Sequence, residues 1–346
     1  MEKPRPCTRE EFTETMELLD LVFCVNRGQP PGMAQSFPCL YSRRNAERMQ
    51  IIKEDGRVVS HVVIWPITMT IEGVPFKVGG LGAVGTHPAY RGRGYSSALL
   101  NHCVRTMEAE ECDFSALWTG IPDFYRRVGW EHGGKILEYT ILREKAERLP
   151  KLNDCIVGWK LSDEDWEGLE QVRQRLPVST IRPPGWTKAV TESRRHLVLT
   201  AKRAGRLVGY TINRGGDIFE FGDEPEAVAG LIRSRFDEYH GQTQLNLQRL
   251  PPGPFAAFLD RLGFERKEAP LGMLRLIRPT QVLEKLGIKG VAIQPAEDFT
   301  IVKWPGHELR LDQRQLVKFF FTADADIPAR PPGLPVFPYC WLLDHV

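Results

Sequence analysis

The chain has 346 residues, of which 42% are hydrophobic and 26% charged, and its formal net charge is +2. This length suggests two or three domains, and the composition is that of a globular protein, which excludes a disordered or fibrous chain. The near-balance of basic and acidic residues gives no electrostatic reason to expect nucleic acid or an anionic membrane as the main partner.

Cysteines and apolar runs narrow the class further. Seven cysteines are scattered along the chain without a C-x-x-C pair, which favours neither a disulfide framework nor a zinc site. No apolar run approaches the ~18 residues of a membrane span, and the N-terminus lacks a signal-peptide pattern. We expect a cytoplasmic protein without a membrane anchor or a metal.

The first 150 residues alternate between helix and strand patterns. Residues 10–24 carry apolar side chains at helical spacing and predict an amphipathic helix. Residues 49–53 and 57–66 flank a turn that ends in Gly56, which predicts a β-hairpin. A separate strand is expected at residues 68–71.

Residues 81–100 join an apolar strand to a helix through a turn that contains Arg-Gly-Arg-Gly. Such a junction directs several backbone N–H groups and the positive end of the helix dipole at one point, where a phosphate can bind. Gly92 and Gly94 let the backbone approach an anion without an intervening Cβ. Arg91 and Arg93 add positive charge beside them.

Two other phosphate-binding loops do not match this turn. A Walker loop needs G-x-x-x-x-G-K-[ST], and a Rossmann fingerprint needs a third glycine and an acidic residue about 20 positions later. An ordinary strand-to-helix turn is the simpler alternative. The turn resembles motif A of the GCN5-related N-acetyltransferase (GNAT) superfamily, Q/R-x-x-G-x-G/A after a strand. This chain has Arg91-x-x-Gly94-x-Ser96, with serine at the last small position.

A second block supports the resemblance. Residues 124–130 read Phe-Tyr-Arg-Arg-Val-Gly-Trp and follow an expected strand at residues 114–118. The block is similar to the GNAT pattern F-Y-x-x-x-G-F, and both blocks stand in the family's order and at its spacing. Residues 1–145 are thereby identified as resembling a GNAT domain.

The resemblance implies how acetyl-CoA binds as a co-substrate. The pantetheine arm would pair with the strand backbone at residues 82–86, and backbone N–H groups of residues 91–96 would bind the pyrophosphate. The residues predicted to contact the coenzyme are Val84, Gly85, Thr86, Arg91, Gly92, Arg93, Gly94, Tyr95 and Ser96.

Acetyl transfer from a thioester to an amine needs a neutral amine, donors for the developing oxyanion and a proton for the departing thiolate. Tyr125 lies where the superfamily commonly keeps its general acid; a packed aromatic side chain is the structural alternative. The expected oxyanion donor is the backbone N–H of Val84. Spacing does not single out a general base among the residues of suitable type, which are His61, His87, Asp123 and Glu131.

The sequence repeats itself beyond residue 150. Residues 205–212 are similar to residues 56–63, and residues 258–265 are similar to residues 124–131, in the same order. Between these blocks the second copy contains nothing like Arg-Gly-Arg-Gly, and Leu259 replaces the tyrosine of the first. We expect a duplicated fold whose second copy is structural and walls the substrate cleft.

The last segment, residues 287–346, ends in an apolar, aromatic stretch. Free chain ends are normally polar and frayed, so we expect this stretch to be docked. Tandem GNAT units followed by a sterol-carrier-like piece resemble the enhanced intracellular survival (Eis) acetyltransferases. That resemblance implies that the terminal carboxylate of Val346 is the general base; the alternative is that Val346 only ends a docked strand.

The predicted fold is therefore α/β: a GNAT fold with a mixed central sheet, tandem duplicated. Residues 1–150 are the expected catalytic domain, residues 151–284 a degenerate GNAT-like domain, and residues 285–346 a small sterol-carrier-like unit whose tail docks toward the active site.

The predicted reaction is direct acetyl transfer, in a ternary complex, to a primary amine of a small molecule, such as an aminoglycoside or a polyamine, or to a lysine. Two alternatives remain open: a longer-chain acyl-CoA or aminoacyl transferase, and a non-catalytic CoA-binding sensor. The resemblance also points to a homo-oligomer, and the sequence leaves the acceptor unidentified.

Overall fold

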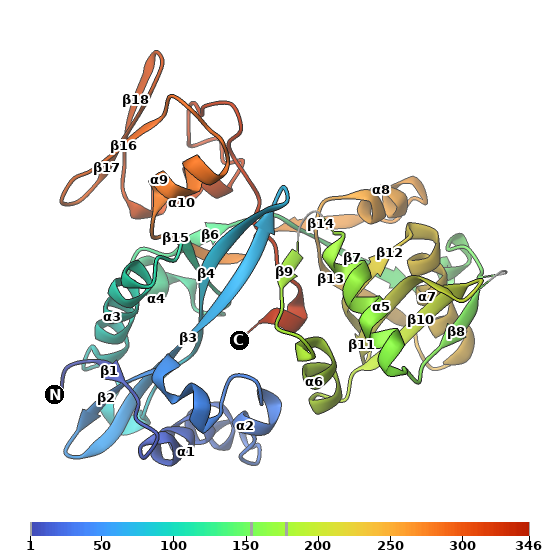
Figure 1. Ribbon diagram of the computed structural model, residues 1–346, viewed down its shortest axis with the longest axis horizontal. Helices are drawn as coiled ribbons and strands as arrows, with labels where there is room; N and C mark the ends of the chain where they lie inside the picture. The colour runs from blue at the N-terminus through green and yellow to red at the C-terminus, as the bar shows by residue number, and fades with distance from the viewer. Residues whose placement is uncertain (1, 153–154, 177–178, 346) are drawn as a thin grey trace.

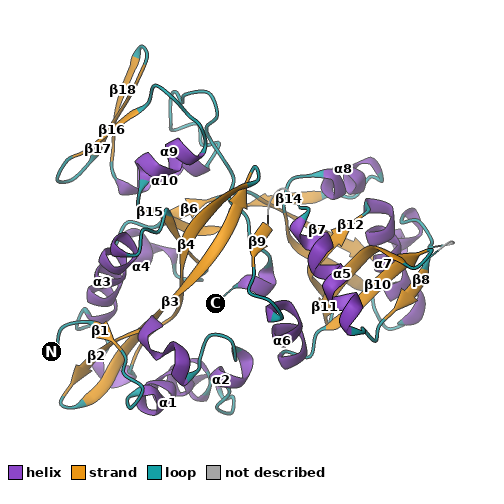
Figure 2. Cartoon of the chain, in the orientation of Figure 1, coloured by secondary structure: helices purple, strands orange, loops and turns teal. Residues whose placement is uncertain are grey.

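The structure is a computed structural model that describes residues 2–152, 155–176 and 179–345. Within these ranges the chain forms three sheets, two large and one small, which Figure 1 shows as separate units around a central C-terminal segment. Helices pack on both large sheets (Figure 2). The described part of the chain is thus a mixed α/β protein with two large units, as the sequence predicts.

The first sheet has eight strands among the described residues. In spatial order its main path is β1 (Arg5–Pro6), β2 (Met49–Glu54), β3 (Arg57–Ile71), β4 (Val74–Thr86), β5 (Phe114–Leu117), β15 (Gly272–Leu276) and β6 (Glu131–Gly133), and β9 (Ser179–Ile181) pairs with β3. Its helices are α1 (Phe12–Phe23), η1 (Val25–Arg27), α2 (Met33–Ser36), η2 (Arg43–Arg48), η3 (Pro88–Tyr90), α3 (Tyr95–Ala109) and α4 (Pro122–Arg126).

The second sheet has seven strands among the described residues and repeats this order. Its path is β8 (Ile156–Gly158), β10 (Leu197–Arg203), β11 (Arg206–Arg214), β12 (Asp217–Asp223), β13 (Gln244–Leu250), β7 (Ile136–Leu142) and β14 (Arg266–Ala269). Its helices are η4 (Arg143–Arg148), α5 (Asp163–Gln174), α6 (Trp186–Ser193), α7 (Pro225–Glu238) and α8 (Pro254–Arg261).

The two sheets exchange one strand. β15, which follows the second unit in sequence, lies between β5 and β6 of the first sheet, and β7, which follows the first unit, lies between β13 and β14 of the second. Both inserted strands are antiparallel to their neighbours. Sheet membership therefore does not change at one point in the chain, because β7 precedes residue 150 yet belongs to the sheet of the later strands.

The third unit contains a small antiparallel sheet and two helices. The sheet consists of β16 (Ala292–Pro295), β17 (Thr300–Trp304) and β18 (His307–Leu311); the helices are α9 (Pro279–Lys285) and α10 (Gln313–Phe321), and η5 (Leu342–Asp344) lies near the end. The predicted sterol-carrier resemblance of this unit stays a prediction. The aromatic tail is docked, as expected, since Tyr339, Trp341 and Leu343 are at most 2% exposed.

The predicted helix and hairpin of the first unit are confirmed by α1, β2 and β3, but the separate strand at residues 68–71 is wrong. β3 continues through Pro66 to Ile71 as one strand. Proline is tolerated because β2 pairs with β3 only as far as Val63, and β9 pairs with it from Thr68 onward. The missing N–H of Pro66 thus falls in a gap between two partner strands.

Candidate active site

A bulge in β4 opens the first sheet. His61 pairs with Gly85 and Val63 pairs with Gly82, so β4 has one residue more than β3 between these pairs. Ala83 accommodates the bulge with a φ of 43°, in the left-handed region that costs a non-glycine residue about 1–2 kcal/mol. Val84 therefore has no partner residue in the register of β3 and β4.

Next to the bulge, β4 and β5 separate. The two parallel strands pair only over Val78–Gly80 and Phe114–Ala116, although β4 continues to Thr86. A cavity of about 1020 Å³ lies at this opening. It is lined by backbone and side chains of Gly82, Ala83, Val84, Trp118, Thr119 and Tyr125, and by residues of α1, η1 and α2.

The junction between β4 and α3 forms a second cavity of about 490 Å³. Gly92 and Gly94 have φ values of 78° and 83°, and a Cβ on either would meet no atom within 4 Å. Gly94 precedes the first residue of α3 and no side chain caps that helix. The first turn of α3 thus has no side-chain cap and no Cβ obstructs the loop before it, an arrangement that suits an anion.

The predicted coenzyme residues, with the exception of Arg93, lie together at these two cavities. Val84, Arg91 and Tyr125 line both, while Gly85, Thr86, Gly92, Gly94, Tyr95 and Ser96 line the smaller one. The Thr86 hydroxyl lies 2.8 Å from that of Ser60 and 2.7 Å from that of Ser96, which ties β3, β4 and α3 together.

Other predicted residues have additional structural contacts. Arg91 donates to the Thr86 carbonyl, and the Arg93 guanidinium lies 5.0 Å from the ring centre of Tyr90. Arg93 is not among the lining residues of either cavity. The side chain of Tyr95 is 3% exposed and packs in the core below α3.

Tyr125 in α4 lies where the two cavities meet. Burial raises the pKa of its phenol to about 12, against a hydrogen bond with Thr119 that lowers it. The phenol is therefore protonated at neutral pH and can donate to a group in the cavity.

Among the described residues, none of the four suggested bases lines either cavity. His87 accepts the N–H of Ala89 and caps η3, and Asp123 pairs with Arg126 on the surface. Glu131 is buried between Arg126 and Arg314. These contacts give each of the three a structural role.

His61 is fully buried below the cavity. Its Nδ1 lies 3.0 Å from the carbonyl oxygen of Ala83, and its Nε2 has no hydrogen-bond partner among the described residues. Burial lowers its pKa to about 4, so the ring is neutral at pH 7.

Val346 lies outside the described residues, so its predicted role as base stays a prediction. The preceding His345 stacks on Trp118, with ring centres 3.8 Å apart and planes at 16°. Trp118 lines the larger cavity. The tail therefore reaches the wall of the candidate active site.

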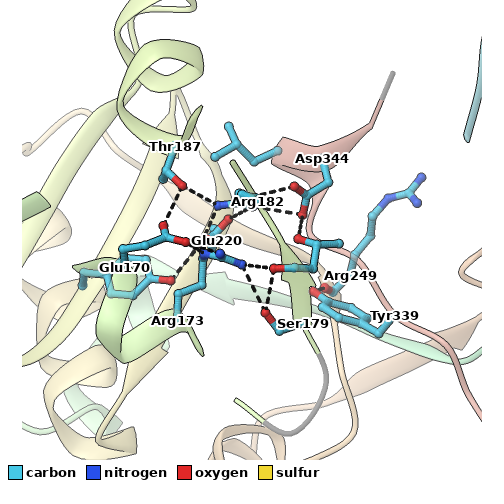
Figure 3. A network of polar contacts seen from close by, with 12 residues as sticks. Glu170, Arg173, Ser179, Arg182, Thr187, Glu220, Arg249, Tyr339 and Asp344 are labelled. Atoms are coloured by element: carbon cyan, nitrogen blue, oxygen red, sulfur yellow. Dashed lines mark hydrogen bonds and ion pairs between the residues drawn. The ribbon is translucent and has the colours of Figure 1, made fainter. Parts of the chain in front are cut away.

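Buried ion pairs hold this tail to the second unit (Figure 3). Asp344 accepts from Arg182 Nε at 2.6 Å and from the Thr180 hydroxyl at 2.7 Å, and Arg182 also donates to Glu220. Burial alone would lower the pKa of Arg182. The carboxylates of Asp344 and Glu220 raise it by more, so the pKa lies well above the ordinary value of arginine. We name Arg182, Asp344 and Glu220 the tail latch.

Sequence reasoning missed Trp118, His345 and the tail latch. The aromatic tail was a signal that something docks. No local pattern, however, indicates a pairing between Arg182 and Asp344, which stand 162 positions apart.

Comparisons with known proteins agree with this geometry. Residues 3–133 match the acetyltransferase (GNAT) domain family. This part of the chain is a GNAT acetyltransferase domain. No curated protein matches the sequence significantly.

Solved structures show the same fold over most of the chain. A conserved protein of unknown function from Enterococcus faecalis has a TM-score of 0.74 and 18% identity, covering 98% of both chains. A GCN5-related N-acetyltransferase from Anabaena variabilis has a TM-score of 0.66 and 15% identity, covering 90% of this chain and 85% of its own. Eis1 from Mycobacterium abscessus has a TM-score of 0.60 and 16% identity, covering 89% and 85%. At these identities the likeness concerns the fold.

No group of three or more His, Cys, Asp or Glu side chains within residues 2–152, 155–176 and 179–345 is placed to hold a metal ion. No helix in these ranges combines the length and apolarity needed to cross a bilayer.

Proposed function

We propose that the GNAT domain transfers an acetyl group from acetyl-CoA to a primary amine. The observation that carries this proposal is the meeting of two cavities at Tyr125, one at a glycine-rich helix N-terminus and one at the bulge of β4. The smaller cavity suits the pyrophosphate, and the uncommitted edge of β4 suits the amide groups of pantetheine. A thioester would then lie between Val84 and Tyr125.

In this arrangement the amine attacks the thioester carbonyl and forms a tetrahedral intermediate. The Val84 N–H donates to its oxyanion, and collapse releases the thiolate of coenzyme A. The amine nitrogen gives its proton to the terminal carboxylate of Val346, the base that the family resemblance implies, which passes it to solvent. A thiol has an ordinary pKa near 8.5, below that of Tyr125. Full proton transfer from the phenol would be uphill, so Tyr125 acts chiefly by donating a hydrogen bond to the departing sulfur.

The test is free-thiol release from acetyl-CoA across a panel of primary amines, with Tyr125→Phe as the variant. We expect kcat to fall about 100-fold while acetyl-CoA binding by calorimetry is unchanged. Leu259→Met, at the equivalent position of the second unit, is the matched control and should keep full activity. Tight CoA binding without thiol release for any amine would favour a sensor, and release only with longer acyl-CoA donors would favour another acyltransferase.

A further inference from the structure

The lining of the larger cavity indicates which kind of amine acceptor fits there. This inference rests on the proposed acetyl transfer. The cavity wall combines polar and apolar surface in similar proportion, with residues from α1, η1, α2, the segment between α2 and η2, and the loops around β5. The apolar and aromatic members that define it are Phe23, Met33, Phe37, Tyr41, Trp118 and Ile121.

The charged lining is of one sign. Arg27 and Arg91 line the cavity, and none of its lining residues in the described chain is Asp or Glu. The nearby carboxylate of Asp20 is already engaged, since it accepts the backbone N–H groups of Gly32 and Met33 at 2.9 Å each. A polycationic acceptor would meet the Arg27 guanidinium with no side-chain carboxylate among the described lining residues to compensate it; Arg91 also lines the smaller cavity, where it would face the coenzyme phosphates.

Side chains outside the cavity pack against its aromatic residues. The Arg194 guanidinium of the second unit lies 4.5 Å from the ring centre of Phe37, and His345 stacks on Trp118. Phe37 also meets Tyr41 edge to face, with ring centres 6.0 Å apart. Rings fixed in this way present a preformed apolar surface, on which an aromatic or alicyclic body can pack without ordering the site.

We infer that the acceptor is a small primary monoamine on an aromatic or other apolar body, and not a polyamine or an aminoglycoside. The same surroundings help to produce the neutral nucleophile. Desolvation and neighbouring cations both favour the uncharged form of an amine. A monoamine can lose its proton to water at entry and bind neutral, whereas a polycation would have to shed several charges.

The experiment compares kcat/KM for tryptamine and phenethylamine with that for spermidine and kanamycin, at saturating acetyl-CoA and fixed ionic strength. We expect the arylalkylamines to exceed the polycations by about tenfold or more. Equal or higher kcat/KM for spermidine or kanamycin would overturn the inference and leave the proposed acetyl transfer intact. Turnover of no amine at all would overturn both.

A charge variant tests the cause. Asn26 lines the cavity, so Asn26→Asp adds a carboxylate of the same shape there. We expect the preference for tryptamine over spermidine to narrow about tenfold, mainly through a lower KM for spermidine. Asn101→Asp makes the same change on the exposed face of α3 and should leave the preference unaltered. An unchanged preference in an Asn26→Asp protein that still binds CoA would contradict the electrostatic argument.

Discussion

The first and second sheets share one strand order but differ at the junction that follows their fourth strand. In the first unit, residues 87–94 separate β4 from α3 and include the two left-handed glycines. In the second unit, only Glu224 separates β12 from α7, which begins at Pro225. A proline at the first helical position has no N–H to offer an anion. The same topology thus forms an open, glycine-rich helix N-terminus in one copy and a closed corner in the other.

The second difference lies in the neighbouring strand. Val84 on β4 and Phe221 on β12 are equivalent, since each precedes the glycine that pairs with His61 or Tyr210. Val84 lies outside the ladder and lines both cavities, whereas the ring of Phe221 packs 4.9 Å from Trp341 of the tail. The space beside this strand is a cavity in the first unit and is filled by Phe221 and Trp341 in the second. The second unit instead binds the C-terminal tail through the tail latch.

The largest expected effect follows from breaking that latch. Asp344→Asn leaves Arg182 beside Glu220 with half of its buried charge compensation lost. Removing one partner of a buried pair costs about 3–5 kcal/mol, and urea unfolding should show a loss of that order. Glu308→Gln, which removes the exposed pair with Lys303, is the control and should change the free energy of unfolding by at most about 0.5 kcal/mol. A loss below about 1 kcal/mol for Asp344→Asn would mean that the tail is held by its aromatic side chains alone.

The next effect concerns His61, whose counterpart Tyr210 donates to Glu220 and does not titrate near neutral pH. The pKa of His61 is about 4 in the folded protein and about 6.5 in an unfolded chain. The unfolded state therefore takes up a proton first as the pH falls. Stability is unaffected above pH ~6.5 and decreases toward pH ~4, by up to about 3 kcal/mol for this group.

Urea midpoints of the wild type and of His61→Gln, measured at pH 7.5 and at pH 5, test this sign. The variant should lose less stability than the wild type between the two values. Equal losses would show that His61 does not contribute to acid sensitivity.

These comparisons also show what the sequence could and could not predict. The open loop between β4 and α3 was predictable because Gly92, Gly94 and Arg91 stand within one loop and share one local geometry; that it binds the coenzyme stays a prediction. The exchange of β7 and β15 was not predictable, because strand pairing across units leaves no local pattern. The separate strand at residues 68–71 was wrongly predicted for a related reason. Pro66 fits within β3 only because β2 and β9 pair with β3 on either side of it, and this pairing depends on the assembled sheet.

A smaller effect is expected from replacing Gly94, where coenzyme binding and backbone strain can be measured separately. Gly94→Ala should raise the KM for acetyl-CoA about tenfold, because a φ of 83° costs alanine about 1–2 kcal/mol and the loop would relax away from the phosphate. Gly205→Ala is the matched control, with a φ of 80° in a turn of the second unit and equally open surroundings. Both variants should lose similar stability in a thermal melt, and only Gly94→Ala should weaken acetyl-CoA binding. Equal KM values for the two variants would mean that the loop at Gly94 does not contribute to coenzyme binding.

The smallest effect concerns the bulge itself. The φ of 43° at Ala83 is unfavourable for an alanine because of a Cβ clash, and glycine would adopt that conformation without it. Ala83→Gly should therefore stabilise the protein by up to about 1 kcal/mol despite the greater freedom of the unfolded chain. A differential scanning calorimetry trace would show it as a small rise in Tm. Val84 would stay in place, so kcat should remain near the wild-type value; a large fall in kcat would mean that the alanine side chain, which lines the cavity, itself contacts a substrate.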